Sequence, residues 1–546
     1  MDIKKTIYIL ALQNAIKYEG RANPGSIMGL VFGMDPKLKQ KAKEISKEVQ
    51  VAIKKVNKLS LEEQKKELEQ TGEIQKKQKK QAGLFDFLRI KKGDKIITAF
   101  PPGPEKYPHI GHAKAILLNY LLAKEYNGKF ILRFEDTNPT LVKKEFYKIM
   151  EDDFTWLGVR WDNIQYASDN MELFYKYAEQ LIKSGDAYLC YCDRETISKN
   201  RRSGTTCECH NNENQLKHWK DYFKAKQGSA SVRLRIDMKH QNTVMRDPTI
   251  FRIIDKTHAR LKNKYRVWPN YDFQNAIMDG KYGITHRLRS KEFELRSELQ
   301  TYIQKLLKLY NTTTYEFARF NLEGVLSSGR EIREKIESKE LSGWDDPRLT
   351  TLAALRRRGF LPEAIKDFII STGISKAEGT LTWDNLIVLN KKYIDKTASR
   401  YSFIEKPIKI KIKGAKKQKI KAPLHPETDK GYRNFETHNE FYIQKSDKSE
   451  KDQPYRFMHL FNFKNNEFLS EDYDSKLKAK LIHWLPVSKN NIEVEIVMND
   501  NSIIKGLAES NIKNIKLNEV IQFERFGFCK LDKKEKNKYI FYYTHR

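Results

Sequence analysis

The spacing of apolar positions divides the chain into a helical start, a region of alternating strands and helices, and a β-rich end. Over residues 1–92 apolar side chains recur at helical intervals, and Ser60-Leu-Glu-Glu63 has the residues of a capping box. The run of Lys and Gln at 75–81 predicts a solvated helix or a linker. These patterns predict a helical N-terminal extension without catalytic residues.

Residues 93–190 predict a βαβ unit. An apolar strand at 95–100 is followed by a helix-length run at 113–126 and a second strand from Lys129 to Phe134. Strands joined by a helix in this way lie parallel in one sheet. Strand and helix patterns resume over 251–325, after a stretch with a separate strand at 230–236. We therefore expect a Rossmann-like parallel-sheet domain in two halves, with an insert at 191–250.

The pattern changes twice more toward the C-terminus. Residues 326–400 have helical spacing, whereas short alternating runs at 407–413, 493–497 and 538–543 predict strands. Such short runs favour antiparallel β-barrels. The predicted fold class is multidomain α/β, with helical domains and C-terminal β-barrels around the parallel sheet, and the predicted domains are 1–92, 93–190, 191–250, 251–325, 326–400 and 401–546.

Charge and length narrow the function classes. The 546 residues exceed what one core can hold, and 102 Lys and Arg against 71 Asp and Glu give a net charge of +31. Such an excess favours a polyanionic partner, although a Lys-rich surface kept for solubility is the alternative. No apolar run is long enough for a membrane helix and no secretory signal is evident, so we expect a cytoplasmic protein.

Four of the five cysteines form two closely spaced pairs. Cys190-Tyr-Cys192 and Cys207-Glu-Cys209 could hold a structural Zn²⁺ with four thiolates, with His210 as a substitute ligand. The spacer within each pair is shorter than usual for zinc, so four reduced thiols in a small polar insert are the alternative.

A candidate phosphate site lies between the two predicted strands, at Pro108-His-Ile-Gly-His112. Free backbone N–H groups at a helix start attract anions, each imidazole adds a donor, and Gly111 allows close approach. Glu135 and Asp136 follow the second strand, at the same carboxyl edge of the sheet where ligands bind. The alternatives are a surface or core histidine pair and a solvated loop.

The whole segment from Thr98 to Ala115 resembles the HIGH signature of class I aminoacyl-tRNA synthetases. Leu326-Ser-Ser-Gly-Arg330 occupies the place of the second signature, Lys-Met-Ser-Lys-Ser, and Gly343-Trp-Asp-Asp-Pro-Arg-Leu349 with Leu355-Arg-Arg-Arg-Gly359 resembles the glutamyl/glutaminyl branch. Tyr8-Ile-Leu-Ala-Leu-Gln-Asn-Ala-Ile16 and the β-rich end are similar to the archaeal-type glutamyl-tRNA synthetases. By this resemblance, the insert binds the acceptor stem, 326–400 contacts the stem, and the barrels read the anticodon.

The resemblance implies ATP-dependent activation of L-glutamate and its transfer to the terminal adenosine of tRNA. His109 and His112 would hold phosphate, and Arg330 would neutralise the departing pyrophosphate. ATP, entering with Mg²⁺, would also contact Pro102, Gly111, Ser327 and Ser328. Positioning and charge stabilisation would do most of the catalysis.

The resemblance also implies an amino-acid pocket. Tyr271 and Asn275, four residues apart, would share one helix face, and Glu135 would receive the substrate ammonium. Arg289 stands where glutaminyl enzymes carry cysteine, and a guanidinium pairs with a carboxylate but not with an amide. One departure is Ala99, where most relatives have Arg; Lys106, in place of a usual glycine, is a candidate to compensate.

A glutamate–tRNA ligase is therefore the predicted function, with a glutaminyl-tRNA synthetase or an inactive RNA-binding paralogue as alternatives. The expected partners are tRNA(Glu), ATP and L-glutamate, with tRNA(Gln) an open second substrate, and the expected state is a monomer. Five barrel residues are candidates for anticodon contacts or, more readily, for core packing: Tyr455, Phe457, Phe523, Arg525 and Phe526.

Overall fold

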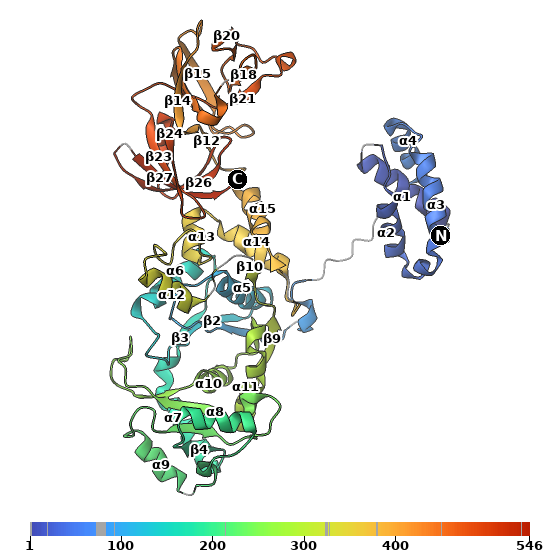
Figure 1. The fold of residues 1–546 in the computed structure, drawn as a ribbon. Helices are drawn as coiled ribbons and strands as arrows, with labels where there is room; N and C mark the ends of the chain where they lie inside the picture. The colour runs from blue at the N-terminus through green and yellow to red at the C-terminus, as the bar shows by residue number, and fades with distance from the viewer. Residues whose placement is uncertain are drawn as a thin grey trace. The chain divides into compact units, whose positions relative to one another are not determined.

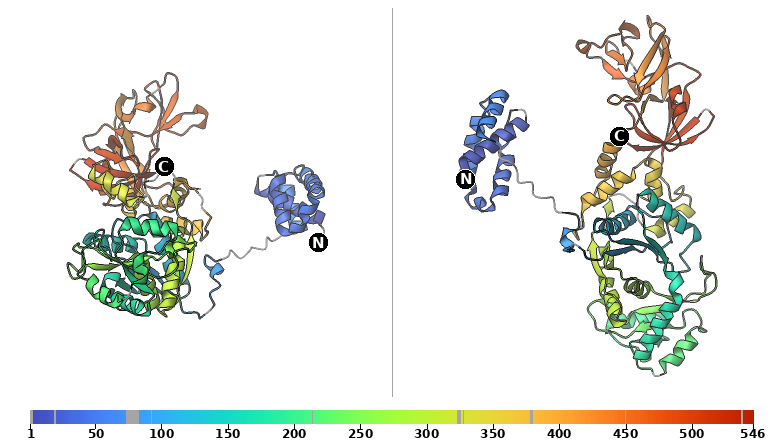
Figure 2. Two further views of the ribbon diagram at one scale, coloured as in Figure 1. Left: turned by 60° about the horizontal axis from the view of Figure 1, so that its bottom comes forward. Right: turned by 180° about the vertical axis from the view of Figure 1, so that it is seen from behind.

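The computed structural model describes residues 3–18, 20–72, 83–91, 93–212, 214–322, 326, 328–377, 380–448, 450–536 and 538–546. The chain forms two compact units, Met1–Asp86 and Phe87–Arg546. Figure 1 shows both units in ribbon form, and Figure 2 shows them from two further directions. Ser327 and the 75–81 run lie outside the described residues.

The first unit is a helical bundle. Its helices are α1 (Ile3–Lys17), α2 (Pro24–Met34), α3 (Ala42–Val56) and α4 (Leu61–Thr71). Ser60 and Glu63 form the predicted capping box at the start of α4. Aliphatic side chains on α1, among them Ile7, Leu10 and Leu12, are buried against α2 and α3, and this packing supplies the stability that helical spacing alone does not.

The second unit is built on a five-stranded parallel sheet. Its strand order is β3-β2-β1-β8-β9, and every neighbouring pair is parallel. Helix α5 (Ile110–Glu125) joins β1 to β2, as the βαβ pattern predicts. The strands are β1 (Ile97–Phe100), β2 (Lys129–Phe134), β3 (Asn163–Tyr166), β8 (His286–Ser290) and β9 (Thr313–Phe317), and the further helices are α6 (Lys144–Trp156), α7 (Met171–Ser184), α10 (Tyr271–Tyr282) and α11 (Glu294–Leu306).

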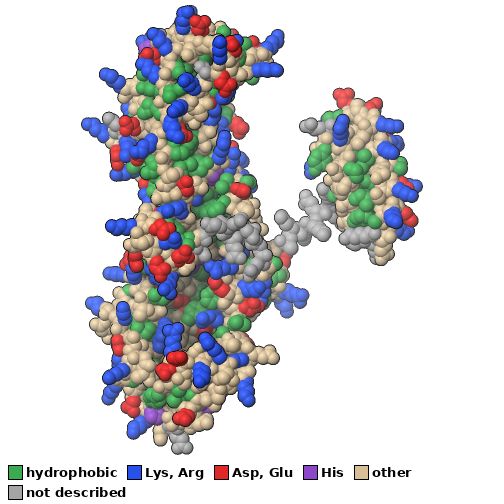
Figure 3. Space-filling model, in the orientation of Figure 1, with side chains coloured by type: hydrophobic (Ala, Val, Ile, Leu, Met, Phe, Trp, Pro, Cys, Tyr) green, Lys and Arg blue, Asp and Glu red, His purple; other side chains and the backbone are tan. Residues whose placement is uncertain are grey.

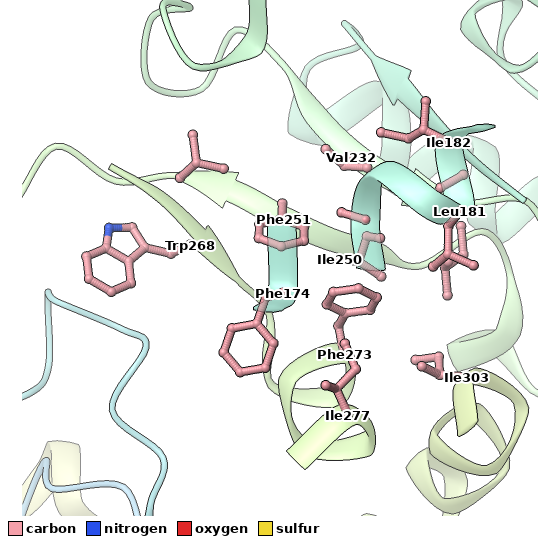
Figure 4. Close-up of a cluster of buried hydrophobic side chains, with 14 of the residues drawn as sticks. Phe174, Leu181, Ile182, Val232, Ile250, Phe251, Trp268, Phe273, Ile277 and Ile303 are labelled. Atoms are coloured by element: carbon pink, nitrogen blue, oxygen red, sulfur yellow. The ribbon is translucent and has the colours of Figure 1, made fainter. Parts of the chain in front are cut away.

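A second, antiparallel sheet interrupts this parallel sheet. It has the order β4-β5-β6-β7, with β4 at Ala187–Cys190, β5 at Ser231–Leu234, β6 at Thr249–Ile253 and β7 at Val267–Pro269. Helices α8 (Arg194–Ser203) and α9 (Gln215–Tyr222) lie within it in sequence. Figure 4 shows Phe251 of β6 and Phe273 of α10 in one core, which ties the insert to the helix that follows it.

The sheet therefore runs beyond both ends of the insert that we predicted at 191–250. Strand β4 lies before residue 191 and strand β7 lies after residue 250. Both strands are fully buried, so their sequences have the same apolar character as the parallel strands. The remaining predicted bounds stay predictions.

Four helices and two short strands follow the parallel sheet. They are α12 (Gly329–Glu337), α13 (Leu352–Arg358), α14 (Pro362–Thr372), α15 (Trp383–Ile394), β10 (Asn321–Leu322) and β11 (Thr380–Leu381). Helices α14 and α15 pack on one another, and Pro362 begins α14 at a position where its missing N–H costs nothing.

The C-terminal region consists of strands, mostly antiparallel, as the alternating pattern predicts. A seven-stranded sheet has the order β12-β25-β26-β27-β23-β24-β13, and smaller sheets have the orders β14-β17-β22, β15-β16 and β20-β19-β18-β21. The bounds are β12 (Arg400–Tyr401), β13 (Phe403–Glu405), β14 (Pro407–Lys411), β15 (Gln418–Pro423), β16 (Tyr432–Thr437), β17 (Glu440–Gln444), β18 (Pro454–Phe457), β19 (Asn462–Lys464), β20 (Glu467–Ser470), β21 (Lys480–Ile482), β22 (Leu485–Pro486), β23 (Ile492–Val497), β24 (Ile503–Ala508), β25 (Val520–Phe523), β26 (Gly527–Lys534) and β27 (Lys538–His545).

Two separate apolar clusters fill this region. Tyr455, Phe457 and Phe523 have no exposed surface and belong to them, so these three candidates serve core packing. Among the described residues, no helix has the length and apolar character that spanning a membrane requires.

Candidate active site

A cavity of about 950 Å³ opens at the carboxyl edge of the parallel sheet. Phe100 and Ser290, the last residues of β1 and β8, line it together with loop residues from across the second unit. This is the edge at which α/β sheets bind ligands. Eight of the predicted site residues line the cavity: Pro102, His109, Gly111, His112, Glu135, Tyr271, Arg289 and Ser328.

The side chains of His109 and His112 cap the start of α5 by accepting hydrogen bonds from backbone N–H groups. The Nδ1 atom of His109 accepts from the backbone N–H of Gly111 at 3.0 Å, and Nδ1 of His112 accepts from the N–H of His109 at 3.2 Å. An imidazole that accepts at Nδ1 carries its proton at Nε2 when neutral. Each ring is therefore set as a neutral Nε2–H donor.

Burial keeps both rings neutral. Burial, together with the Lys106 ammonium, lowers the pKa of His109 to about 3 and that of His112 well below its ordinary value. Gly111 is required locally, because a Cβ there would lie 2.8 Å from Cε1 of His109. The arrangement can bind an anion through N–H dipoles without a proton transfer.

Three arginines lie on one face of the parallel sheet, beneath α10. Arg133 of β2 and Arg287 of β8 are fully buried and share Asp279 of α10 as ion-pair partner, the Arg133 pair at 2.8 Å. Arg289, two residues along β8 and so on the same face, donates to Gln300 Oε1 at 2.9 Å and to Ser297 Oγ. Two of the three, Arg287 and Arg289, line the cavity and place guanidinium groups in its wall.

Glu135 is the carboxylate of this group. Its Oε1 accepts from Asn275 at 2.8 Å and lies 3.3 Å from Arg133 NH2, while Oε2 accepts from Gln274. Burial raises the pKa of Glu135 to about 7, against the opposing effect of Arg133 and Arg287. The carboxylate can therefore receive a cation only once it is ionised.

Helix α10 brings Tyr271 and Asn275 to the same side, as the four-residue spacing predicts. Tyr271 lines the cavity, whereas Asn275 lies behind it and joins Glu135 to Arg287. Asn275 therefore orients charged groups of the wall and does not itself face the ligand space.

Ala99 does not face the cavity. Its methyl group is fully buried with Ile97, Ile131 and Ile284. Because β1 and β8 pair at Thr98 and His286, Ala99 and Arg287 are lateral neighbours on the same face.

The guanidinium beside Ala99 thus comes from Arg287 of β8, one strand away from the residue that the resemblance singled out. Arg287 and Arg252 line the cavity but were not among the predicted site residues, and Lys106, named only as a candidate to compensate for Ala99, lines it too. The period-two spacing of His286-Arg-Leu-Arg289 was a signal for Arg287, since it puts both arginines on one face. No local pattern pointed to Arg252, which follows from the insert's fold.

Arg330 lies at the start of α12 with its side chain 85% exposed. Its Nε atom donates to Glu334 Oε1 at 2.9 Å, one turn along the same helix, and the residue does not line the cavity. Ser328 caps this helix through its hydroxyl. The predicted ligand role of Arg330 stays a prediction.

The four cysteines come together as a candidate metal centre. The sulfur atoms of Cys190, Cys192, Cys207 and Cys209 all lie within 4.8 Å of one another, and Cys190 and Cys207 are 3.8 Å apart. A tetrahedral site with Zn–S bonds of about 2.3 Å has S···S edges of about 3.8 Å, so the set fits zinc with little contraction. His210 is not part of this set, and its Nε2 atom lies 3.6 Å from Oδ2 of Asp247.

The comparisons with known proteins agree with this geometry. A family described as the catalytic domain of class I tRNA synthetases (E and Q) matches residues 95–396, and two anticodon-binding domains of the same synthetases match 398–482 and 481–532. A glutamate–tRNA ligase of Pyrococcus furiosus is 41% identical and one of Methanocaldococcus jannaschii 38% identical, each aligned over 100% of both chains.

A crystal structure of a glutamate tRNA ligase from Elizabethkingia meningosepticum covers 56% of this chain and 70% of its own, with 17% identity and a TM-score of 0.42, and adds nothing to the assignment. The family matches and the full-length relatives establish the family to which this chain belongs. The chain belongs to the class I tRNA synthetases of the glutamate and glutamine branch.

Proposed function

We propose that the chain is a glutamate–tRNA ligase, which joins L-glutamate to tRNA(Glu) at the expense of ATP. The observation that carries the proposal is one cavity with two different walls. Neutral histidine donors at a helix start lie on one side of it and would suit phosphate, and the guanidinium groups of Arg287 and Arg289 lie on another and would suit a carboxylate. Full-length relatives named glutamate–tRNA ligase support it independently.

In the first step the α-carboxylate of glutamate attacks the α-phosphorus of ATP, and pyrophosphate leaves. The Nε2–H groups of His109 and His112 would hold phosphate oxygens as their charge develops, beside the free N–H groups of α5. Pro102, Gly111, Ser327 and Ser328 would shape the nucleotide site, and Mg²⁺ would enter with ATP. Arg330 would have to leave Glu334 to reach the phosphates.

Recognition of glutamate would divide between its two ends. Ionised Glu135 would receive the ammonium, with Tyr271 at the same wall and Asn275 holding the carboxylate in place. Arg289 would pair with the side-chain carboxylate, which an amide cannot match. In the second step a ribose hydroxyl of the terminal adenosine attacks the activated carbonyl and AMP leaves.

Several finer points belong to the same proposal. The enzyme would act as a cytoplasmic monomer and would also charge tRNA(Gln). The Cys190, Cys192, Cys207 and Cys209 thiolates would hold one Zn²⁺ that stabilises the insert.

The test is ATP–pyrophosphate exchange with tRNA present. Exchange that depends on glutamate supports the proposal. Exchange that depends on glutamine would identify a glutaminyl enzyme, and the absence of exchange with either amino acid would identify an inactive paralogue.

A further inference from the structure

The cavity wall beside α12 lacks the charge that phosphate binding needs from its own loop. Ser328 and Gly329 line the cavity but are neutral. Arg330, the next residue, is exposed and paired with Glu334. Ser328 and Gly329 therefore supply no positive charge to this wall.

Lys106, in the loop between β1 and α5, lies against this wall. A Cβ added to Gly329 would be 2.6 Å from Cδ of Lys106 and 3.4 Å from Nζ, so the lysine stem lies on the glycine backbone. Glycine fits here for lack of a side chain, since its backbone is otherwise ordinary. Lys106 itself lines the cavity.

Lys106 and the two histidines line the same cavity. The Lys106 ammonium contributes to the lowered pKa of both His109 and His112, and burial lowers its own pKa. The charged groups that act on it are Glu105, Glu292, Arg319 and Arg333. Within the described part of the chain its Nζ makes no hydrogen bond and no ion pair, which leaves its three donors for a ligand.

We propose that Lys106 is a phosphate-binding residue of the ATP site, which supplies from the β1–α5 loop the positive charge that Ser328 and Gly329 lack. The inference rests on the proposed function. A compact ammonium suits phosphate oxygens, and its effect grows as pyrophosphate departs. Gly329 has a matching role, because its bare backbone lets the lysine stem reach the wall.

The test compares Lys106→Ala, Lys106→Arg and Lys148→Ala. Lys148 is a matched control on α6, since its side chain is 75% exposed and pairs with Asp152 away from the cavity. We expect Lys106→Ala to raise the KM for ATP at least tenfold while the KM for glutamate stays within twofold. Lys106→Arg keeps the positive charge, so its KM for ATP should stay close to the wild-type value. Lys148→Ala should have the wild-type KM for both ATP and glutamate.

Gly329→Ala tests the contact separately, because it keeps the charge but displaces the lysine. It should raise the KM for ATP, and the double variant with Lys106→Ala should be no worse than Lys106→Ala alone. An unchanged KM for ATP in Lys106→Ala, or equal changes for ATP and glutamate without rescue by arginine, would overturn the inference.

Equilibrium titration with ATP alone keeps this inference separate from the proposed function. Weaker ATP binding by Lys106→Ala supports the inference even if wild-type protein activates no glutamate. Unchanged ATP binding in a protein that does activate glutamate overturns the inference and leaves the function intact.

Discussion

At the scale of single residues, the site works through groups whose charge is set by burial. The histidines are neutral donors at physiological pH, while Glu135 titrates near it. The sequence identified these residues because their motifs are local. It did not reveal that Arg287 lies beside Ala99, because that neighbour relation comes from the pairing of two strands that are far apart in the chain.

Arg289→Cys should separate glutamate from glutamine. The variant should lose glutamate activation by about 3 kcal/mol or more, the scale for breaking a buried pair. Glutamine activation should fall far less, because an amide has no charge to pair with the guanidinium. The measurement is kcat/KM for both amino acids.

Arg266→Ala is a matched control, since it removes a guanidinium that is 36% exposed and paired with Asp255 outside the cavity. This control variant should leave the preference for glutamate over glutamine unchanged. Equal losses for both amino acids in Arg289→Cys would show that Arg289 holds the fold and does not select the substrate.

Glu135 predicts the pH dependence of glutamate activation. With a pKa raised to about 7, the free protein gains the carboxylate form as pH rises, so kcat/KM for glutamate should rise through about pH 7 and then level off. The histidines should add no inflection near 6.5, because their pKa values are lowered.

Glu135→Gln should be weakly active, with a flat profile over the same range. The free energy of unfolding of the wild type should fall over the pH range in which its activity rises. A raised carboxyl pKa stabilises the folded state fully below its ordinary value and loses that contribution as pH rises through about 7. A rise near pH 7 that persists in Glu135→Gln would assign the titration to another group.

At the scale of elements, hydrophobic periodicity predicted type and order better than extent. The βαβ unit, the capping box of α4 and the strands at the C-terminus follow from local spacing. The insert sheet was larger than predicted, because β4 and β7 are as apolar as the parallel strands and only their pairing assigns them. His210 shows the same limit, since its partner Asp247 is brought to it by tertiary structure.

The cysteine cluster gives a prediction for the insert. If the four thiolates hold zinc, protein purified without chelator should carry about one zinc per chain, and Cys192→Ser should lose it, because each thiolate would be one of four ligands. Metal analysis with a melting curve is the measurement. Cys529→Ser is the control, as this buried cysteine lies outside the cluster. A metal-free wild type would favour four reduced thiols.

At the scale of the whole molecule, charge and domain content point to tRNA. Lys and Arg side chains are spread over both units on the face drawn in Figure 3, interleaved with Asp and Glu. The net charge of +31 is therefore distributed rather than confined to one patch visible there. Composition predicted the class of partner, but it could not say which barrel residues meet the anticodon.

Binding of tRNA should weaken steeply with salt, because each neutralised phosphate releases counterions. We expect roughly tenfold or greater weakening between 50 and 200 mM salt. Affinity measured across a salt series checks this, with the KM for the small substrate glutamate as a reference. A flat response would mean that the basic excess serves solubility alone.

The most direct test of the account is aminoacylation of tRNA(Glu) and tRNA(Gln) transcripts with glutamate and with glutamine. Because Arg287 and Arg289 place guanidinium groups in the pocket wall, we expect glutamate to be joined to tRNA(Glu) and glutamine to be joined to neither tRNA. Charging with glutamine in preference to glutamate, or no charging at all by intact protein, would contradict it.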